Sequence, residues 1–400
     1  MTPHRHKHRY AWRPGNRFDL LVDGRAYFPR MLEAIELARA YVWLEIYLFE
    51  SGSVADRFID ALARAARRGL DVRVLADDFG AAGLRDSDRA RLTAAGAALI
   101  LYNPLRWRRR FGNMLRDHRK LLIVDDAVAF VSGTGLTDEF DDPGSPGHSW
   151  RETAVRISGP VLTDWQAVFA QVWGEQRGGT PAPAGRTPGA LADGMLGRVA
   201  ISAGLRVQDI RRSLFRRVRA AEHRVWIATA YFVPSRRLLR ALKRAAARGA
   251  DVRLLLPGPH TDHPAVRHAG RRFYGGLLAA GVRVFEYQPR FLHAKTILCD
   301  GWVSAGSSNF DRWNLRWNLE ANQEVDDPRF AEDARVMFEN DFRDSLEIRP
   351  SDWHGRGWWA RMREQLWGKM DLLLEALGRR KERNEALLRF APFVLSEKRG

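Results

Sequence analysis

An internal repeat is the feature that most limits how this chain can fold. A stretch rich in β-branched and aromatic residues, 41–47, is followed by an Ala/Arg helix pattern that ends at Gly69 and by a second strand pattern from Asp71. The same order returns later, with Gly249 and Asp251 each 180 positions further on. Two strand-helix-strand units predict an α/β fold of two similar halves, each a mixed β-sheet flanked by helices, related by a pseudo-twofold axis.

The repeat also sets the expected domain boundaries. We assign residues 17–177 to the first half and residues 200–347 to the second. Glycine and proline concentrate between them, so residues 178–199 are predicted to form an exposed linker. Residues 1–16 form a basic tail that lacks the apolar stretch of a secretion signal. The repeat then stops, and residues 348–400 form a separate C-terminal segment.

The charge balance indicates an anionic partner. The 400 residues include 65 Lys and Arg against 48 Asp and Glu, a net charge of +17. Nucleic acid and an anionic membrane are the two candidates. No apolar run approaches the ~20 residues needed to span a bilayer, so only a peripheral membrane association is compatible with the sequence. A hydrophobic content of 45% is ordinary for a globular protein and excludes a disordered chain.

Two His-x-Lys pairs carry the chemistry that the sequence reveals. In an extended strand, residues two apart share a face, so His118 with Lys120, and His293 with Lys295, each present an imidazole beside an ammonium. A single pair is often no more than a solvated strand end. Two pairs at equivalent places in a repeat, in a chain with only seven lysines, instead predict one symmetric site.

A hairpin and a turn of small residues follow each pair. The chain is expected to reverse at Asp125 and at Asp300, whose odd offsets from the lysines would turn their side chains away from the site. We therefore interpret both aspartates as hairpin-stabilising. The hairpins lead to residues 132–135 and 306–309, whose backbone N–H groups and hydroxyls suit phosphate oxygens.

This set of groups favours phosphodiester chemistry. One imidazole can attack phosphorus while the other protonates the leaving alcohol, and the phosphohistidine then passes its group to water or to another alcohol. Two lysines and an asparagine can stabilise the developing negative charge. No cluster of Asp, Glu and His has the spacing of metal ligands, so neither a metal nor a cofactor is predicted.

Residues 118–125 and 293–300 resemble the His-x-Lys, four residues, Asp motif of the phospholipase D superfamily, and the resemblance covers the chain from about Asp19 to Asp344. It implies that His118 is the nucleophile and His293 the general acid, with Lys120 and Lys295 on the phosphate. It also implies that downstream acidic residues orient each histidine, and the matching positions here are Glu152 and Glu320.

The small-residue turns depart from the family pattern. The first ends in Gly135 where the family has asparagine, and Thr134 is a candidate for the missing donor. In the second, Asn309 and Ser307 are expected to bind phosphate. Only five residues separate Asp300 from Gly306, one fewer than in the family, which requires a shortened strand or a tightened turn. A weakened enzyme, or a derivative that only binds its ligand, therefore remains an alternative. Three further residues are expected to line the site, with β-sheet core as the equal alternative: Glu45, Tyr47 and Tyr231.

Within the superfamily, several strings look most like short bacterial cardiolipin synthases without N-terminal membrane helices. These strings are residues 73–80, 231–235, 256–258 and 287–293. The resemblance implies transfer of a phosphatidyl group between phospholipids, with phosphatidylglycerol giving cardiolipin and glycerol. A phospholipase D-like hydrolase and a basic, metal-independent nuclease are the alternatives.

The C-terminal segment favours a lipid partner. From Trp358 to Leu377, tryptophan, methionine and leucine recur at helical spacing, with Arg and Lys largely elsewhere, as in an interfacial helix. A helix packed on the protein core shows the same pattern. Basic and aromatic residues also alternate at 106–111, where they suit lipid headgroups or a nucleic-acid strand. We expect phospholipid substrates and peripheral attachment to the cytoplasmic side of the cell membrane, with nucleic acid as the less favoured partner.

Overall fold

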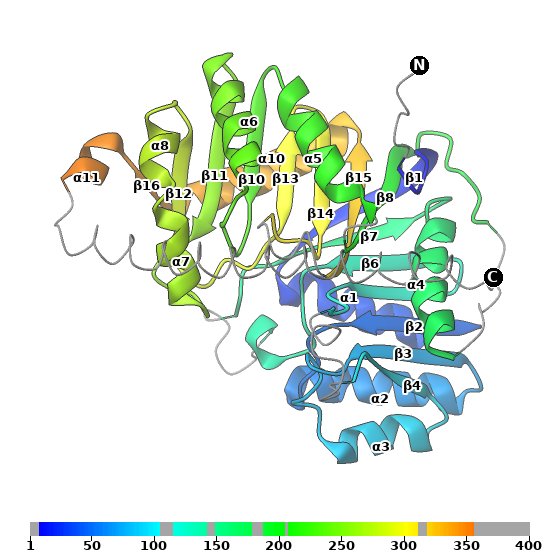
Figure 1. Cartoon of the computed structure of the whole chain (residues 1–400). Coiled ribbons are helices and arrows are strands. Elements are labelled where there is room, and N and C mark those ends of the chain that lie inside the picture. The colour runs from blue at the N-terminus through cyan, green and yellow to red at the C-terminus, as the bar shows by residue number, and fades with distance from the viewer. Residues whose placement is uncertain are drawn as a thin grey trace, which may run out of the picture.

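The computed structural model describes residues 8–104, 115–141, 149–177, 187–204, 207–310 and 318–355 (Figure 1). The predicted interfacial helix at 358–377 and the basic stretch at 106–111 lie outside these ranges. No helix in the described ranges is long and apolar enough to cross a bilayer.

The first half begins with a long strand and ends with a long helix. Its elements are β1 (Arg13–Val22), α1 (Gly24–Leu37), β2 (Tyr41–Ile46), α2 (Ser53–Arg67), β3 (Asp71–Asp77), α3 (Asp86–Ala94), β4 (Ala98–Tyr102), β5 (Lys120–Val124), β6 (Val128–Ser132), the 3-10 helix η2 (Asp138–Phe140), β7 (Thr153–Ser158) and α4 (Leu162–Arg177).

The second half repeats this plan and adds a short terminal strand and helix. Its elements are β8 (Met195–Ala203), β9 (Val207–Gln208), α5 (Asp209–Ala220), β10 (Arg224–Ala228), α6 (Arg236–Ala247), β11 (Asp251–Pro257), α7 (Pro264–Arg271), α8 (Tyr274–Leu278), β12 (Arg283–Tyr287), β13 (Thr296–Cys299), β14 (Trp302–Gly306), β15 (Leu319–Asp326), α10 (Pro328–Arg343), β16 (Ser345–Ile348) and α11 (Pro350–His354).

Strand order confirms the predicted repeat. The first half runs β1-β7-β6-β5-β2-β3-β4 and the second runs β8-β15-β14-β13-β10-β11-β12, with β16 added at its edge. In each half the last three of these strands are parallel and the others pair antiparallel, so both sheets are mixed. The two sheets join where β1 pairs antiparallel with β8. The predicted α/β fold of two similar halves is therefore confirmed.

Matching turns support the repeat at the level of single residues. Gly69 and Gly249 follow α2 and α6 with φ values of 87° and 96°, a conformation that costs glycine little and other residues more. Asp125 and Asp300 open the β5-β6 and β13-β14 hairpins with φ values of 50° and 49°. Aspartate is among the few non-glycine residues that adopt this region readily.

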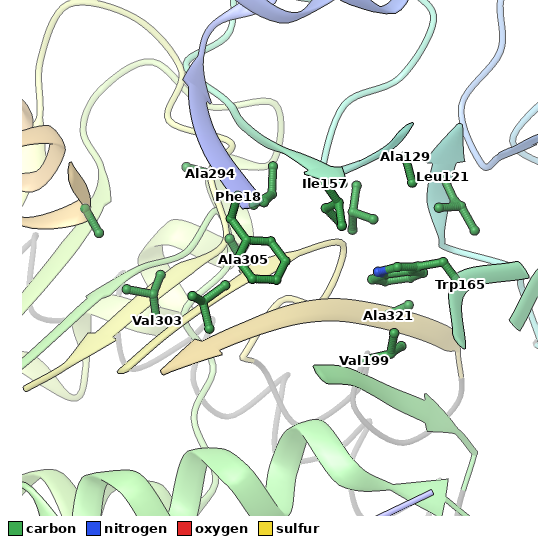
Figure 2. Close-up of a cluster of buried hydrophobic side chains, with 14 of the residues drawn as sticks. Phe18, Leu121, Ala129, Ile157, Trp165, Val199, Ala294, Val303, Ala305 and Ala321 are labelled. Carbon is green, nitrogen blue, oxygen red and sulfur yellow. The ribbon is translucent and has the colours of Figure 1, made fainter. Parts of the chain in front are cut away.

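The core has three parts, one outside each sheet and one between the two halves. The central part, shown in Figure 2, includes Phe18 and Trp165 from the first half with Val303 and Ala321 from the second. Helices α4 and α10 contribute to it, whereas α1 and α2 cover the outer face of the first sheet and α5 and α6 that of the second. Buried apolar side chains thus fix the relative placement of the halves on which the site depends.

Two strands begin earlier than the sequence predicted. Strand β1 starts at Arg13, inside the predicted tail of residues 1–16, and β8 starts at Met195, inside the predicted linker 178–199. The backbone of Arg13 pairs with that of Gly197. Backbone hydrogen bonds hold these strand ends where the two sheets meet. Such bonds do not require alternating apolar side chains, so the hydropathy pattern did not show that the strands begin there.

Candidate active site

Two backbone contacts between the halves create the site. Asp117 forms an isolated parallel bridge with Leu319, and Arg151 forms the equivalent bridge with Leu292. The backbone N–H of His118 also donates to the Leu319 carbonyl oxygen at 3.0 Å. Each His-x-Lys segment is therefore fixed beside the strand start of the other half that carries its glutamate.

The consequence is a crossed pairing of histidines and glutamates. His118 of the first half places Nδ1 2.9 Å from Oε1 of Glu320 in the second. His293 of the second half places Nδ1 2.7 Å from Oε2 of Glu152 in the first. Because each Nδ1 is engaged by a buried carboxyl group, Nε2 is the ring nitrogen that can face a substrate. The Lys295 ammonium lies beside the His293 ring, with Nζ 2.7 Å from Nδ1 and 3.1 Å from Nε2. The sequence predicted the four residues but gave no indication that the pairs cross between halves.

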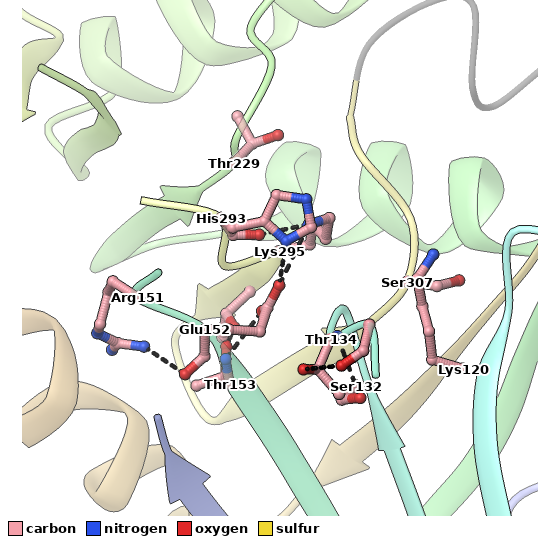
Figure 3. A network of polar contacts seen from close by, with 12 residues as sticks. Lys120, Ser132, Thr134, Arg151, Glu152, Thr153, Thr229, His293, Lys295 and Ser307 are labelled. Atoms are coloured by element: carbon pink, nitrogen blue, oxygen red, sulfur yellow. Dashed lines mark hydrogen bonds and ion pairs between the residues drawn. The ribbon is translucent and has the colours of Figure 1, made fainter. Parts of the chain in front are cut away.

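Glu152 is surrounded by positive charge and hydrogen-bond donors (Figure 3). The Lys295 ammonium lies 3.2 Å from its Oε2, and the backbone N–H of Thr153 donates to its Oε1 at 2.8 Å. Gly133 makes room for this carboxylate, since a Cβ there would lie 2.3 Å from Oε2. The small-residue turn of the first half thus admits the glutamate to its place beside His293.

Glu320 has a hydroxyl where Glu152 has an ammonium. Ser307 Oγ donates to Glu320 Oε2 at 2.5 Å. The lysine of this half, Lys120, instead donates to the carbonyl oxygen of His118 at 2.6 Å and lies 5.0 Å from the centre of the Tyr47 ring. The two pseudo-symmetric histidines therefore have electrostatically different partners.

This difference gives the two glutamates opposite pKa shifts. Burial raises the pKa of Glu320 to about 8, and the nearby Lys120 offsets only part of that effect. Burial acts on Glu152 in the same direction, but Lys295 and the hydrogen bond from His293 outweigh it and lower the pKa of Glu152. At neutral pH the carboxyl beside His118 is mostly protonated and the one beside His293 is ionised.

The histidines and lysines are shifted toward their neutral forms. Burial, followed by the charge of Lys295, lowers the pKa of His293 to about 4. Burial, with Lys120 and Lys295, lowers the pKa of His118 well below its ordinary value. Burial also lowers the pKa of Lys120 to about 7, against the opposing effect of Glu320. Such a site gains most from an anion, which would restore the positive charge on these groups.

One cavity of about 420 Å³ opens onto both histidines. Its wall draws on both halves and mixes aromatic, amide and carboxylate groups with the two imidazoles. The lining residues are Tyr47, Leu48, Glu50, His118, Lys120, Gly133, Gly135, Glu139, Phe140, Trp150, Tyr231, Asp262, His263, His293, Asn309 and Asn318.

Besides the two histidines and Lys120, three residues predicted to lie at the site line this cavity: Tyr47, Tyr231 and Asn309. The ring of Tyr47 lies edge-on to His118 with the ring centres 4.6 Å apart. Tyr231 donates its hydroxyl to Asp262 at 2.5 Å. Asn309 is fully buried, and within the described residues neither of its side-chain polar atoms has a hydrogen-bond partner. Asn309 thus keeps a free amide for a ligand in the cavity.

Glu45 does not line the cavity, contrary to our expectation. It lies opposite Leu121 in the β2-β5 pair, on the strand face away from Lys120. Its carboxylate instead forms a buried ion pair with Arg119, with Oε1 3.2 Å from Nη1. Because side chains alternate along a strand, Arg119, the middle residue of the His-x-Lys motif, points to the face opposite that of Lys120. Glu45 lies on the same face as Arg119.

Thr134, Ser307 and Lys295 also depart from their expected places. The Thr134 hydroxyl accepts from Tyr27 and donates to the Gly135 carbonyl oxygen, both at 3.0 Å, and does not face the cavity. The Ser307 hydroxyl is bound to the glutamate described above rather than free for phosphate. The Lys295 side chain is fully buried against Glu152 and is absent from the cavity wall. The polar atoms of all three side chains are therefore bound to other groups of the protein.

Asp125 and Asp300 act on the backbone, away from the cavity. The Asp125 carboxylate accepts the N–H groups of residues 39, 40 and 41 at 2.9 Å each. The Asp300 carboxylate accepts the equivalent three, 222, 223 and 224, at 2.8 to 3.0 Å. Each aspartate thus ties its hairpin to the start of the neighbouring strand. The missing residue after Asp300 is explained by a tightened turn, because the second hairpin loop has two residues where the first has three.

Eight wall residues were not assigned to the site from the sequence. Trp150 precedes Glu152 by two positions, and its ring centre lies 5.2 Å from that of His293. Its place on the same face of an extended segment was a usable signal. The others reach the cavity from loops and from the short 3-10 helix η2, which strand periodicity does not describe: Leu48, Glu50, Glu139, Phe140, Asp262, His263 and Asn318. Within the described ranges no group of three His, Cys, Asp or Glu side chains is arranged to hold a metal ion.

Comparisons with known proteins agree with this architecture. The solved structure of phosphatidylserine synthase from Haemophilus influenzae superposes with a TM-score of 0.67 over 92% of this chain and 94% of that one, at 14% identity. Polyphosphate kinase from Porphyromonas gingivalis superposes with a TM-score of 0.57 over 84% of this chain and 49% of that one, at 16% identity. These similarities show a common fold.

Sequence comparison is more specific. Cardiolipin synthase A of Pseudomonas putida strain W619 is 36% identical over 342 residues, covering 84% of this chain and 71% of the relative. Cardiolipin synthase B of Salmonella typhimurium is 33% identical over 364 residues, covering 87% and 86%. Residues 31–173 and 214–342 match the family model described as cardiolipin synthase, PLD-like domain. The chain therefore belongs to the cardiolipin synthase family of phospholipase D-like proteins.

Proposed function

We propose that the protein transfers a phosphatidyl group between two phosphatidylglycerol molecules, giving cardiolipin and glycerol. One observation carries this proposal: two imidazoles from different halves line the same cavity, and each Nδ1 is held by a buried carboxyl group. The printed names of the relatives, cardiolipin synthases A and B, supply the substrate class.

In the first step His118 is the nucleophile. Its lowered pKa leaves the ring neutral at pH 7, and a hydrogen bond from Nδ1–H to Glu320 leaves the Nε2 lone pair free to attack phosphorus. The new P–N bond forms as the bond from phosphorus to the glycerol oxygen breaks. His293 Nε2–H gives its proton to that oxygen, and glycerol leaves.

His293 suits the role of acid because of its carboxylate. The ionised Glu152 stabilises an imidazolium on its Nδ1 side, and the negative charge of a bound phosphodiester favours the same protonated form. Lys295 keeps Glu152 ionised. We therefore propose that Lys295 supports the reaction indirectly, by holding the Glu152 carboxylate in place and stabilising its negative charge. A protonated carboxyl beside His118, in contrast, favours the neutral ring that a nucleophile needs.

The second step reverses the roles of the two rings. The hydroxyl of a second phosphatidylglycerol passes its proton to His293 Nε2, and its oxygen attacks the phosphohistidine. The P–N bond breaks, cardiolipin is released and His118 returns to its neutral state. The sum is two phosphatidylglycerol molecules consumed for one cardiolipin and one glycerol, with no net proton change.

Lys120 and Asn309 are the groups placed to stabilise the phosphate. Both line the cavity, and the Asn309 amide has its hydrogen-bonding capacity free. Binding an anion would raise the pKa of Lys120 from about 7 and restore its full charge where negative charge develops. Because both substrates lie in a bilayer, the protein is proposed to work as a peripheral enzyme at the cytoplasmic membrane surface.

The test is an assay on phosphatidylglycerol vesicles that follows cardiolipin, phosphatidic acid and glycerol. Wild type should form cardiolipin and glycerol in equal amounts, and His118→Ala and His293→Ala should not. Phosphatidic acid as the main product would make the protein a hydrolase. Cleavage of plasmid DNA without lipid turnover would overturn the proposal in favour of a nuclease.

A further inference from the structure

The helices that cover the second sheet are far more basic than their counterparts on the first. Helix α5 carries five arginines and one aspartate, and α6 carries four arginines and one lysine with no acidic residue. In the first half, α1 has two arginines and two glutamates, and α2 has three arginines and two aspartates. Since both pairs cover equivalent faces of equivalent sheets, the fold itself does not require the charge on α5 and α6.

The charge is gathered around a hollow between α5 and α6. Two adjoining cavities of about 660 and 300 Å³ lie along these helices and share Arg219 and Arg237 in their walls. We call this feature the arginine groove. The arginines that define it are Arg212, Arg216, Arg219, Arg237, Arg240 and Arg244.

Most of this charge is not neutralised within the protein. Asp209 pairs with Arg212 at 2.9 Å. Within the described residues, no carboxylate forms an ion pair with Arg216, Arg219 or Arg237, and all three are exposed. The Arg237 guanidinium lies 5.0 Å from the centre of the Phe215 ring at the inner side of the groove, which holds it in place.

The lining identifies the kind of ligand. It consists of guanidinium groups with Gln208, alanine and a buried phenylalanine, so it offers no exposed ring on which a base could stack. Guanidinium groups bind phosphate oxygens in a bidentate manner. The lining thus favours phosphate groups without favouring nucleobases.

We propose that the arginine groove docks the protein on an anionic phospholipid surface by binding lipid phosphate groups outside the active site. The proposal rests on the function proposed above, because substrates that reside in a bilayer require the enzyme to approach one. The groove supplies attraction through charge, and the active-site cavity supplies the chemistry. Each guanidinium near an anionic surface contributes about fivefold to the partition coefficient.

The test compares two triple variants of the full-length protein. Arg216→Gln/Arg219→Gln/Arg237→Gln removes three charges from the groove. Arg25→Gln/Arg30→Gln/Arg67→Gln removes three exposed charges from the equivalent helices α1 and α2 and is the matched control. Binding is measured by flotation with vesicles of phosphatidylcholine alone or mixed with phosphatidylserine, an anionic lipid that is not the proposed substrate.

Wild type should bind the anionic vesicles and leave the neutral ones, and high salt should release it. The groove variant should bind roughly 100-fold more weakly and the control variant nearly as well as wild type. Equal losses in both variants, or no preference of wild type for anionic vesicles, would overturn the proposal. So would an unchanged vesicle affinity together with lost binding to a DNA duplex.

Activity on detergent-dispersed phosphatidylglycerol separates this inference from the proposed function. The groove residues lie outside the catalytic cavity, so the groove variant should retain wild-type transfer in the dispersed assay and lose it on vesicles. If wild type itself shows no transfer, the proposed function fails. The vesicle-binding result still decides whether the arginine groove docks the protein on an anionic surface.

Discussion

The two halves of the active site share a backbone but differ in charge. Around His293, an ionised Glu152 is held by the Lys295 ammonium. Around His118, a mostly protonated Glu320 is held by the Ser307 hydroxyl. The same repeat that places two imidazoles at one cavity therefore gives each a different protonation preference. Pseudo-symmetry sets the positions, and a few side-chain differences set the division of roles.

Removing each histidine is expected to have the largest effect and to separate the two roles. His118→Ala should lose at least about 10⁴-fold in transfer on any substrate, because no phosphohistidine can form. His293→Ala should lose about 10²- to 10⁴-fold on phosphatidylglycerol. On a p-nitrophenyl phosphatidyl ester, whose leaving group needs no proton, His293→Ala should recover its initial burst. A recovered burst in His118→Ala instead would reverse the assignment.

The glutamates should differ in stability when each is changed to glutamine. Glu152→Gln breaks a buried ion pair and leaves Lys295 without its counter-charge, at a cost of about 3 to 5 kcal/mol. Glu320→Gln replaces a mostly neutral carboxyl with a neutral amide and should cost less than about 1.5 kcal/mol. Urea unfolding at neutral pH measures both, and equal losses would contradict the opposite pKa shifts.

The pH dependence of stability should separate the same two glutamates. The raised pKa of Glu320 means that its contribution to stability is present below its ordinary value of 4.5 and is lost as the pH rises through about 8. Glu320→Gln should therefore be more stable than wild type above pH 8 and similar to it near pH 5. The lowered pKa of Glu152 has the opposite sign, so its contribution is lost as the pH falls below 4.5. Urea unfolding between pH 4 and pH 9 measures the free energy of unfolding of wild type and of each glutamine variant. If the two carboxyl groups were alike, both variants would change relative to wild type in the same direction with pH.

The hairpin aspartates should behave alike, because each accepts three equivalent backbone N–H groups although the hairpin loops differ in length. Asp125→Ala and Asp300→Ala each leave three backbone N–H groups without an acceptor, and each should cost about 1 to 3 kcal/mol. Asparagine at either position retains one acceptor oxygen and the positive φ, so it serves as the milder control. A twofold or greater difference between the two alanine variants would show that the hairpins are not equivalent.

Restoring symmetry at Gly135 should change stability about as much as the loss of one hairpin aspartate. A Cβ there would lie 2.9 Å from Cβ of Leu48, so Gly135→Asn should cost about 1 to 3 kcal/mol through overpacking. Adding Leu48→Ala removes the contacts with Cδ2 and Cγ at 3.0 and 3.1 Å but keeps Cβ, so it should recover only part of that loss while a second amide stands near the cavity. If Gly135→Asn alone is as stable as wild type, Leu48 is not the reason for the missing asparagine.

The sequence predicted the parts of this molecule that depend on local periodicity. Strand and helix patterns around Gly69 and Gly249, and the motif spacing around Lys120 and Lys295, are properties of short segments. These were enough to predict the fold and the four central side chains. The positions of Tyr47 and Tyr231 followed from their places at the ends of the equivalent strands.

What the sequence could not reveal depends on how the halves pack. The exchange of Glu152 and Glu320 between halves requires the backbone bridges at Leu319 and Arg151, which join positions far apart in the chain. Glu45 was assigned to the wrong face because β2 ends at Ile46, and the alternation that places Glu45 stops before Tyr47. The orientation of a hydroxyl such as that of Ser307 depends on its buried hydrogen-bond partners, which the sequence pattern does not predict.

In the proposed reaction His118 carries the phosphatidyl group while His293 moves the proton. Wild type should be quenched during turnover of phosphatidylglycerol, digested, and its phosphatidyl-histidine peptide located by mass spectrometry under conditions that preserve the P–N bond. We expect an adduct on the peptide that contains His118, present in His293→Ala and absent from His118→Ala. An adduct on the peptide that contains His293 would contradict it.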